Sequence, residues 1–143
     1  IDILKFAADY PIVLSSGHAN KAETYELINA CEQFGVPNLL LNQPANPLTG
    51  LDASDLLAIA KQSFVSIEQT ALTYLLGYQT IDDFKAVLQS VPNVIYSSDL
   101  GQTSQMNINE WYQQSIQWFD DMTISASRKA EICLHNPLKL ITI

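Results

Sequence analysis

The sequence predicts an α/β domain in which short buried strands alternate with helices and form a parallel sheet. Four apolar runs bounded by turn residues lie at 11–16, 38–42, 64–69 and 93–99. Their starts are 26 to 29 residues apart, which is about the length of a strand and its crossover helix. No consensus repeats between these units, which argues against a solenoid. The pattern is typical of a doubly wound sheet or of part of a β/α barrel.

Composition limits the classes of protein to consider. Of 143 residues, 48% are hydrophobic and 15% are charged, which excludes disorder and allows one domain over residues 1–143. The net charge of −8 argues against a nucleic-acid partner, and no apolar run is long enough for a membrane span. With no signal-like segment at the start, we expect a cytoplasmic protein. The low charge content favours self-association.

The first helices are indicated by apolar spacing and by their end residues. Residues 1–10 are typical of the end of an amphipathic helix that stops at Pro11, so we expect the chain to be part of a longer protein. A second helix is predicted over 21–35, with Asn20 as its N-cap and Gly35 as the residue that ends it.

The later helices follow the same alternation with the apolar runs. They are predicted over 54–62, 81–91, 106–122 and 125–136. Ser54 is the expected N-cap of the helix over 54–62, and Thr80 is the expected N-cap of the helix over 81–91. Pro137 is expected to end the last one, because proline lacks the amide that a helix interior needs.

Polar side chains follow each predicted strand, where parallel α/β folds carry their chemistry. They are Ser15, Ser16, Gly17 and His18; Asn42, Gln43 and Asn46; Glu68, Gln69 and Thr70; and Ser97, Ser98, Asp99, Gly101 and Gln102. If the strands are parallel neighbours, these residues line one edge of the sheet, and His18 and Asp99 are expected to face a shared cavity there.

Three ionisable residues in this group have both a functional and a structural interpretation. His18 is a metal ligand or a hydrogen-bonded loop histidine. Asp99 holds a metal or accepts a proton from metal-bound water, or it is a turn aspartate. Glu68 lies in a mostly apolar strand and needs a metal, a cation or hydrogen bonds, unless it is a solvated strand-end acid. Elsewhere, Cys31 and Cys133 are expected in the core.

Several segments together resemble the C-terminal half of the amidohydrolase-like, metal-dependent hydrolases. The segments are IVLSSGH (12–18), LLLNQP (39–44), FVSIEQT (64–70), VIYSSDLGQ (94–102) and HNPLKLITI (135–143). The resemblance covers nearly the whole chain and implies the second half of a (β/α)8 barrel. Glycine positions give no phosphate-binding fingerprint, so no nucleotide cofactor is expected.

The resemblance implies roles for particular residues. His18 is similar to a metal-ligating histidine, and Asp99 is similar to a metal-associated catalytic base. Gln43 stands where the family has a further histidine, and the paired histidines of the first barrel strand are absent from the chain. Gln43, Glu68 and Ser98 are expected to line a substrate pocket. The implied cofactor is a divalent metal of the zinc or manganese type.

Three functions follow as expectations. The first is a metal-dependent hydrolase that cleaves C–N or C–O bonds of a small polar substrate, active only once the missing N-terminal half of the barrel is restored. The second is a non-catalytic relative that keeps the barrel and has lost the site. The third is a small α/β binding domain that uses the same strand-end residues.

Overall fold

The four strands form one sheet in which neighbouring strands are parallel and follow chain order. The computed structural model describes residues 2–142, so the terminal isoleucines included in the sequence predictions lie outside it. The strands are β1 (Leu14–Ser15), β2 (Leu39–Leu41), β3 (Val65–Thr70) and β4 (Val94–Ser97). The predicted parallel α/β arrangement is therefore confirmed, with most strands shorter than the apolar runs that contain them.

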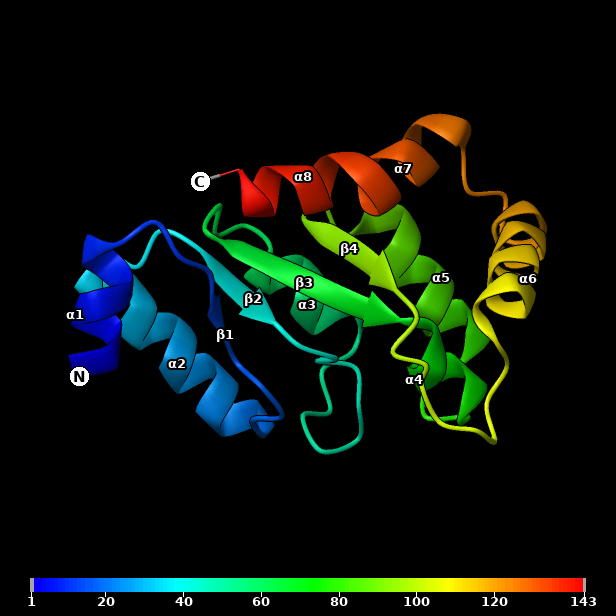
Figure 1. The fold of residues 1–143 in the computed structure, drawn as a ribbon. Coiled ribbons are helices and arrows are strands. Elements are labelled where there is room, and N and C mark those ends of the chain that lie inside the picture. Colours follow the sequence, from blue (N-terminus) through cyan, green and yellow to red (C-terminus); the bar gives the residue numbers. More distant parts are fainter. Residues whose placement is uncertain (1, 143) are drawn as a thin grey trace.

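Helices connect the strands and extend the chain beyond them (Figure 1). They are α1 (Asp2–Asp9), α2 (Lys21–Phe34), α3 (Ala53–Ile59), α4 (Ala71–Leu75), α5 (Ile81–Ser90), α6 (Ile108–Asp121), α7 (Ala126–Ala130), a π-helical turn η1 (Glu131–His135) and α8 (Asn136–Ile141). None of the helices within residues 2–142 has the length and apolar character to cross a bilayer.

Local hydrogen bonds account for where the helices begin. Asn20 caps α2 in a reciprocal capping box with Glu23, as expected from the sequence. Thr80 caps α5, also as expected. The predicted cap Ser54 is wrong: Asp52 caps α3 instead, because its carboxylate accepts the amide of Asp55 at 2.9 Å.

The C-terminal helical segment does not end at Pro137, contrary to the sequence prediction. It continues through α7, η1 and α8, with the proline in the first turn of α8. In the π turn the amide of Asn136 donates to the carbonyl of Glu131, one residue further back than in an α-helix. This shift lets the chain pass the proline at a position where its missing amide is tolerated.

The two faces of the sheet differ in what covers them. Side chains alternate along β3, so that Val65 and Ile67 are buried while Ser66 and Glu68 remain partly exposed. In Figure 1, α3 and α5 lie behind the sheet and the viewer looks onto its other face. The core lies between the strands and these helices. The face that carries Glu68 is uncovered except toward the start of β3, where Ser66 and α8 line a common cavity.

An aromatic cluster fixes the later helices to the covered face of the sheet. Phe84 of α5 is fully buried, and its ring stacks on that of Tyr74 with centroids 5.0 Å apart. Trp118 of α6 meets both rings edge-on, at 5.4 Å from Tyr74 and 6.2 Å from Phe84. Trp118, an aromatic residue of the predicted helix 106–122, therefore has a packing role: it holds α6 against α4 and α5.

Candidate functional site

Glu68 lies at the centre of a hydrogen-bond network on the uncovered face of the sheet. Its carboxylate accepts from the Asn42 amide at 3.2 Å and from the Ser97 hydroxyl at 2.9 Å. These donors follow β2 and end β4, so Glu68 is joined to both neighbours of its own strand. Both donors are uncharged, and the carboxylate oxygens have further acceptor positions that these two contacts do not use.

Asn42 extends this network to the loop after β1. Its backbone amide donates to the Ser16 hydroxyl at 3.0 Å, and its side-chain oxygen accepts from the Gly17 amide at 3.2 Å and from the Ser15 hydroxyl. The four strand ends are thus linked by one chain of polar contacts. We refer to Asn42, Gln43, Glu68, Ser97 and Asp99 as the carboxyl rim.

Gln43 and Asp99 form the second part of the carboxyl rim. The Gln43 amide donates to the Asp99 carboxylate at 2.5 Å. Both residues have positive φ, at 44° and 53°, in the left-handed region that costs a non-glycine residue about 1–2 kcal/mol. Strained backbone of this kind concentrates at functional sites, which makes the pair the strongest local signal of function.

The structure shows specific contacts for several of the predicted site residues. Gln43 and Asp99 are in contact, and Glu68 has the hydrogen bonds that the sequence analysis named as one way to satisfy it. His18 lies in the exposed loop after β1. The hydroxyl of Ser98 accepts the Leu100 amide at 3.3 Å, which gives it a local role in the turn.

The rim as described does not fit a metal ion by itself. Within residues 2–142, no group of three or more His, Cys, Asp or Glu side chains is arranged to hold a metal. A catalytic zinc typically needs three protein ligands, and here neutral amides and a hydroxyl occupy the neighbourhood of both carboxylates. A zinc or manganese site would need ligands from another segment or subunit.

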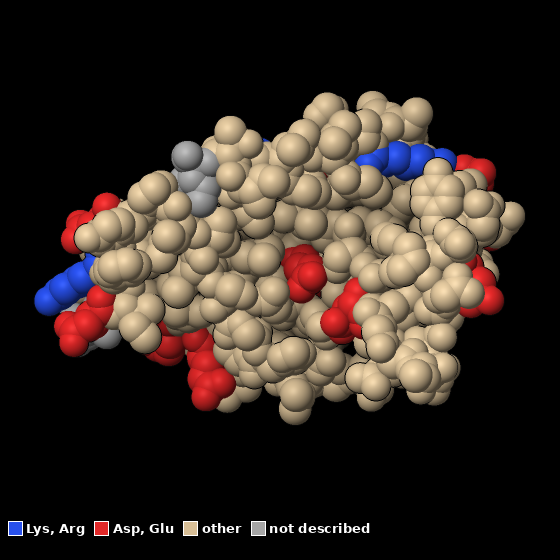
Figure 2. All heavy atoms as spheres, viewed as in Figure 1, with Lys and Arg blue, Asp and Glu red and all other residues tan. Residues whose placement is uncertain are grey.

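Charge is unbalanced at the rim. The ion pairs found among the described residues lie elsewhere: Lys21–Asp55, Arg128–Glu131 and Lys129–Asp120. Neither Glu68 nor Asp99 takes part in them. Figure 2 shows two acidic patches near the middle of the face seen in Figure 1, surrounded by uncharged residues. This part of the surface therefore attracts cations.

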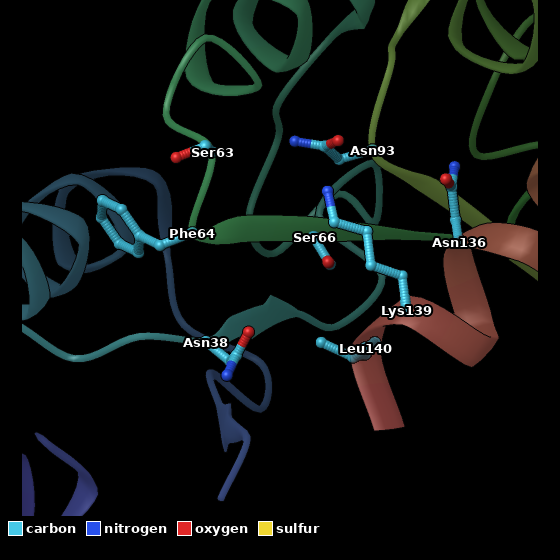
Figure 3. Close-up of a pocket in the computed structure, with 8 residues that line it drawn as sticks. All are labelled: Asn38, Ser63, Phe64, Ser66, Asn93, Asn136, Lys139 and Leu140. Atoms are coloured by element: carbon cyan, nitrogen blue, oxygen red, sulfur yellow. The ribbon is translucent and has the colours of Figure 1, made fainter. Parts of the chain in front are cut away.

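The opposite edge of the sheet is closed by the chain's own C-terminal helix. A cavity of about 50 Å³, enough for a few water molecules, is lined by Asn38, Ser63, Phe64, Ser66, Asn93, Asn136, Lys139 and Leu140 (Figure 3). The Asn136 amide donates to the carbonyls of Pro92 at 3.0 Å and Val94 at 2.7 Å. The Asn-Pro of the sequence resemblance thus has a structural role, and the carboxyl edge is the open one.

Two rim residues were absent from the expected pocket. Asn42 and Ser97 were recognised only as polar strand-end residues, yet they are the partners of Glu68. The signal that finds them is strand register, because Glu68 is paired with Ile95 and the side chain of Ser97 shares its face one step further on. Register between separate strands cannot be read from a single apolar run.

Comparison with known proteins gives one match. Residues 1–68 match the model of a family of unknown function, DUF6282. The matched segment runs from α1 into β3 and includes Asn42, Gln43 and Glu68 of the rim. Searches of curated proteins and of solved structures each returned no match.

Proposed function

We propose that the carboxyl rim binds a small polar molecule that carries a positive charge. The observation that carries this proposal is the hydrogen bond between Gln43 and Asp99, two residues with left-handed backbone. They follow β2 and β4, and the strand between these two, β3, carries Glu68. The Gln43 amide donates to the Asp99 carboxylate and so orients it. A carboxylate held in this way is preorganised for a ligand.

The chemistry of the rim defines the ligand class. Glu68 and Asp99 supply two carboxylates without a basic partner among the described residues, so a guanidinium or ammonium group is the complementary charge. Asn42 and Gln43 supply amides that also orient these carboxylates. Ser97 adds a hydroxyl that can accept from a ligand donor. The chain then acts as a binding domain, one of the expectations drawn from its sequence.

A titration with a matched pair of probes tests this function. We expect n-propylguanidinium to shift the side-chain amide signals of Asn42 and Gln43 in ¹H–¹⁵N spectra. N-propylurea, similar in shape but neutral, should shift them little at the same concentration. Added salt should weaken the guanidinium binding, because the attraction is partly exposed to solvent. Equal responses to both probes, or no response to either, would contradict the proposal.

The metal-dependent hydrolase is the second candidate. It is favoured by strands that follow chain order and by helices α3 and α5 on a single face, which is how half of a β/α barrel is built. Its metal ligands would come in part from another polypeptide segment or a second copy. The test is metal analysis after purification without chelator, followed by ester and amide hydrolysis assays with zinc or manganese. Turnover abolished by Asp99→Asn would support it, and absence of both metal and turnover in the completed assembly would reject it.

A further inference from the structure

A second cavity lies on the other side of β4, away from the carboxyl rim. It encloses about 260 Å³ and is lined by Tyr96, Trp111, Tyr112, Ser115, Ile116, Phe119 and Cys133. These residues come from β4, α6 and the π turn η1. Tyr96 is buried on the helix-covered face, whereas its neighbours Ile95 and Ser97 are only partly buried. The two sites are thus on opposite faces of the same strand.

The walls of this cavity are largely aromatic and are held by contacts with one another. The rings of Tyr96 and Trp111 stack with centroids 5.8 Å apart, and Phe119 meets Tyr96 edge-on at 5.0 Å. The expectation that Cys133 lies in the core is wrong: it is an exposed residue of the π turn, and it lines the cavity. π-Helical turns are rare and are frequently found at functional sites.

The two buried hydroxyl groups of the cavity, those of Tyr96 and Ser115, carry two hydrogens, and their hydrogen bond to each other uses only one of them. The Trp111 indole N–H donates to the Tyr96 hydroxyl at 3.3 Å, and the hydroxyls of Tyr96 and Ser115 lie 2.8 Å apart. Tyr96 is 8% exposed and Ser115 is 5% exposed, so the remaining hydrogen lies in a site largely shielded from bulk solvent.

For two ionisable groups of the cavity, Tyr96 and Cys133, the surroundings raise the pKa and so favour the neutral form. Burial raises the pKa of the Tyr96 phenol, an effect that the hydrogen bonds from Ser115 and Trp111 reduce. Cys133 is exposed as a residue, but desolvation of its sulfur by the surrounding atoms also raises the pKa of its thiol. An ionised ligand would therefore find no charge among these groups to pair with.

We propose that this cavity binds a small, neutral aromatic molecule that carries one hydrogen-bond acceptor such as a carbonyl oxygen. The ring of the ligand packs among Trp111, Ile116 and Phe119, and the acceptor takes the spare hydroxyl hydrogen of the Tyr96–Ser115 pair. The cavity is slightly smaller than the ~300–1,000 Å³ of sites for drug-sized molecules, so it suits a molecule of about one ring.

Two probes of nearly the same shape test the proposal. Acetophenone carries the acceptor, and α-methylstyrene replaces the carbonyl oxygen with a methylene group. Binding is followed by the ¹H–¹⁵N signal of the Trp111 indole, with a Kd for acetophenone of about 1 mM or tighter expected for so small a ligand. α-Methylstyrene should bind about 3- to 10-fold more weakly, since it leaves the hydroxyl hydrogen unpaired.

Variants separate the cavity from nonspecific apolar binding. Ser115→Ala leaves the Tyr96 hydroxyl with one hydrogen free to donate, so this variant should keep the preference for acetophenone over α-methylstyrene. Cys133→Phe should fill the cavity and abolish binding of both probes, whereas Leu134→Phe, at an exposed neighbour that does not line the cavity, should leave both unchanged. Absence of a Trp111 shift with acetophenone overturns the proposal. It is also overturned if acetophenone binds the Cys133→Phe variant as well as the wild type.

Discussion

The side chains of Gln43 and Asp99, 56 residues apart in the chain, meet in a 2.5 Å hydrogen bond at the carboxyl edge of the sheet. They follow β2 and β4, so the strand between them is β3, which carries Glu68. The Asp99 carboxylate accepts a hydrogen bond from Gln43. The Glu68 carboxylate accepts from Asn42 and Ser97, and all three donors are neutral. Both carboxylates therefore lie at the carboxyl edge of the sheet, and none of the ion pairs found among the described residues includes either of them.

The N-cap of α3 should make stability depend on pH. The Asp55 amide is the main cause that lowers the pKa of Asp52, with a further contribution from the Ser54 hydroxyl. Asp52→Ala should cost about 1 kcal/mol at neutral pH. Because the folded pKa lies below the unfolded value, this stabilisation is present above the unfolded pKa and is lost as pH falls through the folded pKa.

Urea unfolding at neutral pH and at about pH 3 measures this effect, with Asp52→Asn as the control. The asparagine keeps an oxygen that accepts the Asp55 amide and does not titrate. In acid, the loss of stability caused by Asp52→Ala should become smaller when it is measured against the wild type. Measured against Asp52→Asn, the loss should be the same at both pH values. The same penalty relative to wild type at both pH values would show that the carboxylate charge does not stabilise the cap.

Asn136 should be important for stability, although it lies far from the carboxyl rim. Its amide bridges two carbonyls at the start of β4, those of Pro92 and Val94. Asn136→Ala leaves these acceptors without that partner and should destabilise the fold by about 1–3 kcal/mol, measured by urea unfolding. Leu138→Ala, at an exposed position in α8, should stay within about 0.5 kcal/mol of wild type. Equal effects of the two substitutions would argue against the bridge.

The uncovered face of the sheet should drive self-association. It carries the partly exposed apolar side chains of Leu40 and Ile95, and the outer edge of β1 has no neighbouring strand in the described chain. We expect sedimentation velocity to detect a dimer whose population rises with concentration. Ile95→Lys should shift it to monomer, whereas Ile3→Lys, on an exposed part of α1, should not. A monomer at every concentration tested would contradict this expectation.

Much of the fold could be predicted from the sequence because its signals are local. Apolar runs located the four strands, and the caps Asn20 and Thr80 located two helices. The continuation past Pro137 was missed because it depends on a π turn, a change of hydrogen-bond register that composition does not mark. Cys133, expected in the core, lies in this same π turn and is exposed.

The sequence predicts that the site lies at the carboxyl ends of the strands. It does not predict which residues contact one another there. Strand direction placed polar residues at the carboxyl ends, and this is where the structure has them. Which of them touch depends on the register between strands and on left-handed backbone at Gln43 and Asp99. Positive φ at glutamine and aspartate is uncommon, so only the folded chain shows it.

The most direct test of the proposed binding site compares the affinity of n-propylguanidinium for single-carboxylate variants by isothermal titration calorimetry. Glu68→Gln and Asp99→Asn should each weaken binding by at least about tenfold, since each removes a charge-assisted hydrogen bond to the ligand. Glu26→Gln, on the exposed side of α2, removes the same charge away from the rim and should bind as wild type does. If all three variants retain the wild-type affinity, the carboxyl rim is not the cation-binding site.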